Sequence, residues 1–250
     1  MSSRIYLVKT AAIGMFLIAV LGGCKVNHFA SYERIYNEVD EQPPNVQITA
    51  FILPFKEILD AEMNEVIGQL PEKISMGRPE STLGNWFADI QQIQTQKLFN
   101  RPVAFSITNS GGMRIPEIAG GSIRKGTIYE LMPFDNQLVV MDMDGKLVQV
   151  LLDHIAGGGG WPISSSVRFE IGQGEKAMNV TINGQPIDLN AKYTIGLSDY
   201  IANGGSGCDF LVGRPFDTQG VLIRDAIIDF LKSGGEVPIG KDGRISKISK

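Results

Sequence analysis

Cysteine and histidine are scarce in this sequence, and the scarcity limits the chemistry that the chain can support. Its 250 residues include two cysteines and two histidines, His28 and His154. A centre that holds two metal ions needs several clustered Asp, His and Asn ligands, and the sequence contains no Asp-x-His or Gly-His-x-His motif. We therefore expect no metal site in this chain, and we interpret His154 as a residue on the face of a helix.

Basic residues are outnumbered by acidic ones. The chain has 23 Lys and Arg against 27 Asp and Glu, which gives a formal charge of −4. An acidic chain is repelled by the phosphate backbone of DNA and RNA, so this balance argues against nucleic acid as a partner. The hydrophobic fraction of 43% is ordinary for a globular protein and is sufficient for a sizeable core.

The N-terminal apolar stretch is too short for a typical transmembrane helix. It covers residues 10–21, follows Arg4 and Lys9, and ends at Leu21-Gly22-Gly23-Cys24. A positively charged start, a short apolar stretch and small residues at its end predict a secretory signal. Leu-Gly-Gly-Cys resembles the lipobox of bacterial lipoproteins, which predicts a signal peptide over residues 1–23 and a lipid on Cys24. The alternatives are an uncleaved anchor and a plain signal peptide.

These N-terminal features predict that the mature chain lies outside the cytoplasm, lipid-anchored in the cell envelope on its periplasmic or outer face. Loss of residues 1–23 removes two basic residues and no acid, so 21 basic and 27 acidic side chains remain and the formal charge becomes −6. Only Cys208 would then be a free thiol, and no disulfide can form within the chain. A nucleophilic role for Cys208 is the alternative, but the sequence offers no obvious base beside it.

The rest of the chain divides into a tether and one domain. Residues 24–45 are rich in charge and end in Gln42-Pro43-Pro44, which is typical of a linker. Residues 46–250 alternate helical and strand patterns without an internal repeat, which predicts a single α/β (α+β) domain with a mixed sheet and flanking helices. The predicted helices are 55–70, 86–98, 146–156 and 221–231, and the predicted strands are 46–53, 103–107, 138–143, 167–171, 178–182, 193–197 and 243–248.

Two glycine-containing segments lie between these elements. Asn183-Gly184 predicts a hairpin that joins the strands 178–182 and 193–197. Gly157 to Gly160 follows a helix and matches neither the phosphate-loop pattern nor the dinucleotide-binding fingerprint. We therefore interpret this glycine run as a flexible connection and assign it no ligand.

A first candidate site segment is Thr108-Asn109-Ser110-Gly111-Gly112-Met113-Arg114, which begins where a short apolar strand ends. Two glycines at this point permit a tight turn or a close approach of the backbone to a ligand. The guanidinium of Arg114 carries a planar fork of donors that suits phosphate or carboxylate oxygens. The alternative interpretation of the Gly-Gly pair is a turn without a ligand.

Three further segments complete the candidate set. Pro133-Phe134-Asp135-Asn136 offers a ring face and an amide, and Tyr200 precedes a second glycine turn at Gly204-Gly205-Ser206-Gly207. Glu80 to Asp89 opens a helix that Ser81 or Thr82 is expected to cap, and the free N–H groups of that helix form an anion site if Arg78 reinforces it. The alternatives are a core phenylalanine behind a kink and a helix cap without a ligand.

The order and spacing of these four segments resemble the C-terminal domain of the 5′-nucleotidases across about residues 46–250. In that family this domain recognises the nucleoside, while a separate N-terminal metallophosphoesterase domain holds two metal ions and cleaves the phosphate ester. The resemblance implies that Phe134 and Tyr200 stack on the two faces of a base and that Asn136 binds the base edge. It further implies that Asn109, Gly111 and Gly112 shape the pocket and that Arg114 contacts ribose or phosphate oxygens.

The sequence departs from the family pattern at two positions. Ser206 stands where the family has an aspartate that often binds the ribose, so a neutral hydroxyl replaces a charge-assisted acceptor. The arginine that often lies three residues before the glutamate falls at Gly77, and Arg78 follows one position later. The roles of Ser206 and Arg78 in ligand binding are therefore open.

These observations predict the nucleoside- or nucleotide-recognition component of a split 5′-nucleotidase, a hydrolase of nucleotide catabolism. The metallophosphoesterase, with two divalent metals, is expected on a separate chain, and no cofactor is expected in this one. One alternative is an envelope lipoprotein that binds nucleosides or nucleotides without hydrolysing them. The other is a degenerate domain that serves only as an interaction scaffold.

Overall fold

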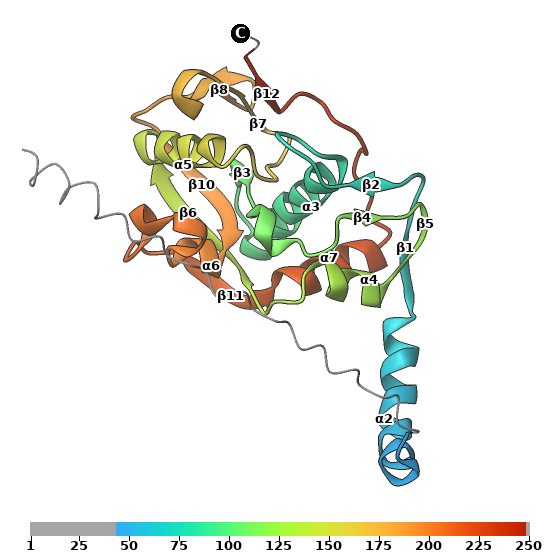
Figure 1. Ribbon diagram of the computed structural model, residues 1–250. Coiled ribbons are helices and arrows are strands. Elements are labelled where there is room, and N and C mark those ends of the chain that lie inside the picture. Colours follow the sequence, from blue (N-terminus) through green and yellow to red (C-terminus); the bar gives the residue numbers. More distant parts are fainter. Residues whose placement is uncertain (1–43, 249–250) are drawn as a thin grey trace, which may run out of the picture. The chain divides into compact units, whose positions relative to one another are not determined.

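The computed structural model describes residues 44–248, which contain a central four-stranded sheet in the order β11-β6-β10-β3 (Figure 1). The strands are β1 (Val66–Leu70), β2 (Ile74–Ser75), β3 (Phe105–Ser106), β4 (Glu117–Ile118), β5 (Gly121–Arg124), β6 (Gln137–Asp144), β7 (Val167–Ile171), β8 (Ala177–Ile182), β9 (Gln185–Pro186), β10 (Lys192–Ser198), β11 (Asp217–Leu222) and β12 (Ile245–Lys247). The predicted signal peptide, Cys24 and almost all of the predicted tether lie outside the described residues.

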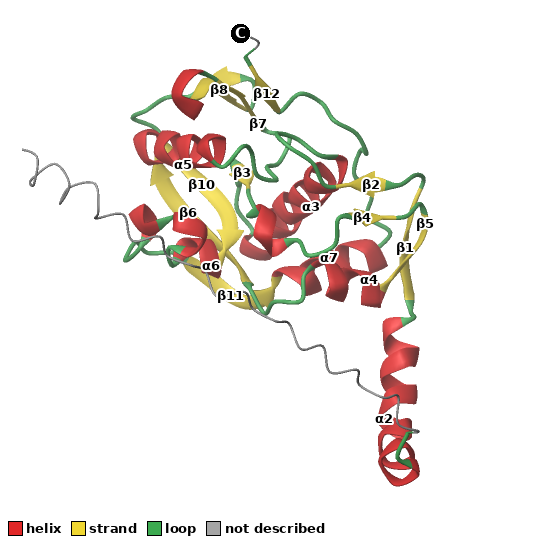
Figure 2. Cartoon of the chain, in the orientation of Figure 1, coloured by secondary structure: helices red, strands yellow, loops and turns green. Residues whose placement is uncertain are grey.

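The helices alternate with these strands along the chain (Figure 2). They are α2 (Val46–Met63), α3 (Thr82–Phe99), α4 (Lys125–Leu131), α5 (Gly145–Gly157), α6 (Asp199–Ala202) and α7 (Ile223–Lys232), and short 3₁₀ turns cover Ser110–Gly112, Gln173–Glu175, Gly205–Gly207 and Asp209–Leu211. This mixture of helices with parallel and antiparallel strand pairs confirms the predicted α/β (α+β) class.

Strand β6 separates two hydrophobic cores. It pairs antiparallel with both β10 and β11, and its side chains alternate between the two faces of the sheet. Val139 packs with α5 and with a second four-stranded sheet, β12-β7-β8-β9, whereas Leu138 packs with α3, α4 and α7. Figure 1 shows α5 between the two sheets and α3 in the middle of the domain.

The first part of the domain differs from the prediction. Residues 46–63 form one helix, α2, with Pro54 inside it, instead of a strand followed by a helix. Ile48, Phe51, Phe55 and Leu59 recur at helical spacing on both sides of the proline, a pattern that the predicted division at Pro54 did not take into account. None of the side chains of α2 is buried, and among residues 44–248 no helix is long and apolar enough to cross a membrane.

The predicted helix also runs too far, because residues 66–70 form strand β1. This strand pairs antiparallel with β5, and its alternation of exposed Val66 with buried Ile67 fits a strand at a surface. A Cβ on Gly68 would lie 3.3 Å from a methyl group of Leu231, so the two segments pack closely here. A close approach of this kind, together with the low helix propensity of glycine and of β-branched residues, ends the helix before this segment.

The predicted Asn183-Gly184 hairpin has a different second strand. The turn joins β8 to the two-residue strand β9, and β9 ends at Pro186, which has no N–H to continue a ladder. The strand expected as its partner, β10, lies instead in the central sheet between β6 and β3. The turn residues predicted the turn but not the length of the strand after it.

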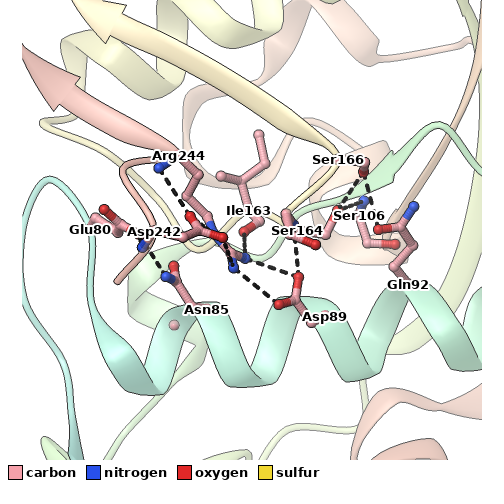
Figure 3. A network of polar contacts seen from close by, with 12 residues as sticks. Glu80, Asn85, Asp89, Gln92, Ser106, Ile163, Ser164, Ser166, Asp242 and Arg244 are labelled. Carbon is pink, nitrogen blue, oxygen red and sulfur yellow. Dashed lines mark hydrogen bonds and ion pairs between the residues drawn. The ribbon is translucent and has the colours of Figure 1, made fainter. Parts of the chain in front are cut away.

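A buried network around Arg244 joins the start of α3 to the C-terminal segment (Figure 3). The guanidinium of Arg244 is 2.9 and 3.0 Å from the two carboxylate oxygens of Asp89, and it also binds Asp242 and the carbonyl of Ile163. Glu80 accepts hydrogen bonds from the Asn85 amide and from the backbone N–H groups of residues 242 and 243. The Glu80 to Asp89 segment is therefore a structural element that fixes the C-terminal strand.

Candidate functional site

Eight of the nine predicted binding residues line one pocket of ≈ 380 Å³. They come from three separate segments of the chain, residues 109–114, 134–136 and 200–206, which the central sheet brings together at one end of β6 and β10. The lining consists of Asn109, Gly111, Gly112, Arg114, Phe134, Asn136, Tyr200 and Ser206, and we call it the first pocket.

The ends of β6 and β10 set the positions of the two aromatic residues. Phe134 and Asn136 lie just before β6, and Tyr200 lies in α6, which directly follows β10. Asp199 connects the two segments, because its carboxylate accepts hydrogen bonds from the backbone N–H of Gln137 at 2.9 Å and of Tyr200 at 2.8 Å. No local pattern in the sequence indicates this role of Asp199, since only the folded chain brings residue 137 next to it.

Both aromatic rings are open to solvent. Phe134 is 41% exposed and Tyr200 is 47% exposed, although neighbouring apolar residues such as Leu138 are fully buried. The Tyr200 ring packs over Gly205, where a Cβ would lie 2.5 Å from two ring carbons, so this position requires glycine. The Tyr200 hydroxyl accepts a hydrogen bond from the backbone N–H of Ser206 at 3.1 Å, which fixes the ring.

Asn109 is a buried polar residue with an unsatisfied atom. Its side chain is 7% exposed, and its Oδ1 has no hydrogen-bond partner among the described residues. A Cβ on Gly112 would lie 3.1 Å from this oxygen, so the absence of a side chain at residue 112 leaves room for the amide. Burying an unpaired amide oxygen costs about 1–3 kcal/mol, and a water or ligand that binds here recovers that energy.

Arg114 supplies the positive charge of the first pocket. Its guanidinium carbon lies 5.8 Å from the centre of the Phe134 ring, a distance suited to a cation–π interaction, and its Nη1 donates a long hydrogen bond of 3.5 Å to the carbonyl of Gly111. We find no carboxylate paired with Arg114 in the described part of the chain. Its remaining donors are available for an anionic or carbonyl oxygen of a ligand.

Ser206 lies at the border of the first pocket in a left-handed conformation, with φ 55°. Its backbone is bound on both sides, because its N–H donates to Tyr200 and its carbonyl accepts a hydrogen bond of 2.9 Å from Nε2 of His154. His154 lies on helix α5, as predicted, but no local pattern indicated that it would contact Ser206 in the glycine turn, 52 residues later.

Arg78, the ninth predicted residue, does not line the first pocket. Its guanidinium donates a hydrogen bond to the carbonyl of Gly158, and the predicted cap of helix α3 is Ser81, which accepts from the N–H of Gly84 at 3.0 Å. The glycine run predicted as a mere connection packs closely here: a Cβ on Gly160 would lie 2.2 Å from the carbonyl oxygen of Pro79. The glycine run therefore packs against the segment that contains Arg78, and its Gly158 carbonyl binds the Arg78 guanidinium.

The thiol of Cys208 is made unreactive by its surroundings. Cys208 is fully buried, and burial, assisted by the charge of Asp209, raises the pKa of its thiol to about 11. A thiol with this pKa is neutral at pH 7 and is a poor nucleophile. Within residues 44–248, no three His, Cys, Asp or Glu side chains are grouped as a metal site requires.

Comparison with known proteins gives the family. Residues 66–213 match the model of the 5′-nucleotidase C-terminal domain, and this range includes the whole lining of the first pocket. The chain belongs to the 5′-nucleotidase C-terminal domain family. A 5′-nucleotidase of Vibrio vulnificus is 25% identical over 87% of this chain, and a probable 5′-nucleotidase of Treponema pallidum is 27% identical over 80% of it.

The fold of this 5′-nucleotidase C-terminal domain is similar to that of a solved relative. The crystal structure of a 5′-nucleotidase precursor from Thermus thermophilus superimposes with a TM-score of 0.69 at 27% identity, over 83% of this chain and 44% of the relative. The chain spans 39% of the length of each of the two curated relatives. The similarity therefore covers less than half of each relative and concerns this domain.

Proposed function

We propose that this 5′-nucleotidase C-terminal domain recognises the nucleoside part of a nucleotide, whose phosphate ester is cleaved by a two-metal phosphoesterase domain on a separate chain. The observation that supports the proposal is the pair of exposed rings, Phe134 and Tyr200, on the lining of one pocket. Aromatic rings that are partly exposed to solvent suit a purine or pyrimidine, and stacking contributes about 1–3 kcal/mol per base. Asn136 and Asn109 add amide groups for the base edge.

In this proposal the chain binds and orients, and the phosphoesterase supplies the metal-bound nucleophile. Stacking energy holds the base, so the ester enters the partner's active site in a fixed orientation. Arg114 would contact the ribose or phosphate oxygens, because it is the cation of the first pocket. The lipid on Cys24 would hold the domain at the envelope membrane, which metabolic labelling with a radioactive fatty acid of the wild type and of Cys24→Ser tests.

The test of recognition is calorimetric titration of the purified full-length chain with adenosine and with AMP. We expect saturable binding, and we expect Phe134→Ala and Tyr200→Ala each to weaken it by about 10- to 100-fold, the loss of one stacking face. Phe55→Ala removes an exposed ring, 64% exposed, that lies outside the first pocket, and it should leave both affinities unchanged. Absence of binding at millimolar ligand would favour the scaffold role instead.

The test of the split arrangement uses a metallophosphoesterase chain from the same organism. We expect AMP hydrolysis by the mixture to exceed that of the phosphoesterase alone and to return to its level with Phe134→Ala. Nucleoside binding that no phosphoesterase changes, with no gain in hydrolysis, would contradict the split enzyme and favour a binding lipoprotein.

A further inference from the structure

A second, larger pocket adjoins the first. It has a volume of ≈ 600 Å³ and shares Asn109, Gly111 and Ser206 with the first pocket, so the two pockets adjoin at these residues. Its other lining residues are Arg78, Ser110, His154, Gly157, Gly158 and Trp161. In the proposed function the nucleoside lies in the first pocket, so the second pocket is available for another part of the same ligand.

The lining of the second pocket is rich in hydrogen-bond donors and contains no Asp or Glu. The guanidinium of Arg78 has no acidic partner among residues 44–248, and of its five N–H groups only one is engaged, by the Gly158 carbonyl. That single contact holds the guanidinium against the glycine run. The chain as a whole is acidic, so a cationic lining without acids is a local exception to its charge.

Trp161 provides a donor without a protein partner. The residue is 8% exposed, and we find no hydrogen bond from its indole N–H within the described part of the chain. This N–H is not among the buried unpaired atoms of the described residues, so it is open to the pocket. An indole N–H is a donor only. Since Trp161 lines the second pocket, the acceptor for this N–H must come from water or from a ligand.

His154 holds Trp161 in place. The two rings meet edge to face, with centroids 5.3 Å apart and an interplanar angle of 87°, and Phe210 packs on His154 from 5.7 Å. The hydrogen bond from Nε2 of His154 to the carbonyl of Ser206 means that Nε2 carries a proton. His154 therefore contacts both the Trp161 indole and the glycine turn beside Tyr200, and it acts as a positioning residue.

We propose that the second pocket binds an anionic oxygen group, such as a phosphate, carried by the ligand whose base lies between Phe134 and Tyr200. The donors are the guanidinium of Arg78 and the indole N–H of Trp161. The inference rests on the proposed function, since it concerns a second group of the same ligand. Guanidinium and N–H donors without a competing carboxylate are the groups that recognise phosphate oxygens in proteins.

The experiment compares ligands that differ only in their phosphate. Purified full-length chain is titrated with adenosine, adenosine 5′-monophosphate and adenosine 3′-monophosphate. At least one monophosphate should bind about tenfold more tightly than adenosine, as expected for charge-assisted hydrogen bonds. Trp161→Phe keeps the ring and removes the N–H, and Arg78→Gln removes the charge. Each should abolish most of this phosphate-dependent gain and leave the adenosine affinity unchanged.

Trp86→Phe is the matched control. It removes the same indole N–H from the only other tryptophan, which is 3% exposed in the other hydrophobic core and lines neither pocket. The phosphate-dependent gain should survive this change. In Trp86→Phe, Trp161 is also the sole tryptophan, so its fluorescence should shift on addition of the monophosphate or of inorganic phosphate and not on addition of adenosine.

The outcomes separate the two proposals. If adenosine binds and the phosphate-dependent gain is unaffected by both Trp161→Phe and Arg78→Gln, the second pocket is not the anion site and only the inference fails. If neither adenosine nor a monophosphate binds, the proposed function fails and the inference fails with it. Should Trp161→Phe not fold, Arg78→Gln still decides the matter, because Arg78 is exposed and outside both cores.

Discussion

The Arg244 network and the two pockets are both built from polar side chains, but they differ in how many of their hydrogen bonds are made within the chain. In the network, both terminal nitrogens and Nε of Arg244 donate to oxygens of Asp89, Asp242 or Ile163. In the pockets, Oδ1 of Asn109 is buried without a partner among the residues described, and we find no hydrogen bond from the accessible indole N–H of Trp161 to any of them. The polar groups of the Arg244 network therefore have partners within the chain, whereas some of those in the pockets do not.

This difference shows that segments which all resemble the family can have different roles, some in stability and others in binding. Glu80 to Asp89 and Asn109 to Arg114 both carry the resemblance, and sequence alone treats them alike. Only the structure shows that the carboxylates of the first segment are fully engaged by backbone N–H groups and Arg244, whereas the second segment opens on a pocket. Complete networks stabilise a fold, and incomplete ones in a pocket are available to a ligand.

Breaking the network should have the largest effect on stability. Arg244→Met keeps an apolar stem but leaves Asp89 buried without its cation, so we expect the free energy of unfolding to fall by about 3–5 kcal/mol. Urea denaturation followed by circular dichroism measures the change. Arg168→Met removes an exposed arginine, also paired with Asp242, and should cost less than about 1 kcal/mol. Equal effects of the two substitutions would contradict the role of the network.

The same substitution should change the response to acid. Burial alone would raise the pKa of Asp242, but the hydrogen bonds and charge of Arg244 lower it below its ordinary value. A lowered pKa stabilises the fold above the unfolded pKa, near 4, and this contribution is lost as pH falls through the folded value. The wild type should therefore lose more stability on acidification below about pH 4 than Arg244→Met, as measured by urea denaturation at each pH.

Removal of the Asp199 carboxylate should affect stability and binding together. Asp199→Ala frees the backbone N–H groups of Gln137 and Tyr200, and we expect a loss of about 1–3 kcal/mol in stability. Because these contacts set the spacing of Phe134 and Tyr200, adenosine affinity should also fall, as titration measures. Asp217→Ala, at a side chain that is 70% exposed, is the control and should change neither quantity much. A loss of stability without a loss of affinity would show that Asp199 does not position the rings.

Much of this fold was predictable because the residues involved carry local signals. The strand at 167–171 and helix α5 follow directly from alternation and from helical spacing, and Ser81 caps α3 as its residue type suggests. The residues of the first pocket were predictable for another reason, since they lie in the segments that resemble the family. Local pattern alone would have called each of them a turn or a core residue.

The remaining features depend on distant contacts that no local pattern encodes. Residues 66–70 are apolar enough to continue a helix, and their pairing with β5, more than 50 residues later, makes them a strand. His154 and Trp161 are seven residues apart on no common face, and the glycine run between them folds the two rings together. Asp89, a partner of Arg244, lies 155 residues away in the sequence, so no local pattern predicts their ion pair.

Tyr200→Phe tests how far the internal contacts of the first pocket matter. The substitution keeps the stacking face and removes the hydroxyl that accepts from the N–H of Ser206. We expect adenosine affinity to fall by about two- to tenfold, the value of one neutral hydrogen bond that orders the ring. Phe134→Tyr adds a hydroxyl on the opposite ring and serves as the control. An effect as large as that of Tyr200→Ala would indicate that the hydroxyl itself binds the ligand.

The smallest expected effect concerns Ser206, which lines both pockets and can distinguish what each of them binds. Ser206→Asp places a carboxylate at their border, and its left-handed φ is tolerated by aspartate. A carboxylate accepts hydrogen bonds from ribose hydroxyls but repels phosphate, so we expect adenosine to bind about threefold more tightly and the favoured monophosphate about threefold more weakly. Ser206→Asn has the same shape without the charge and should move neither affinity in this way. Opposite shifts for the two ligands would place sugar and phosphate on either side of Ser206, whereas parallel shifts would mean that the ligand's charge lies far from the second pocket.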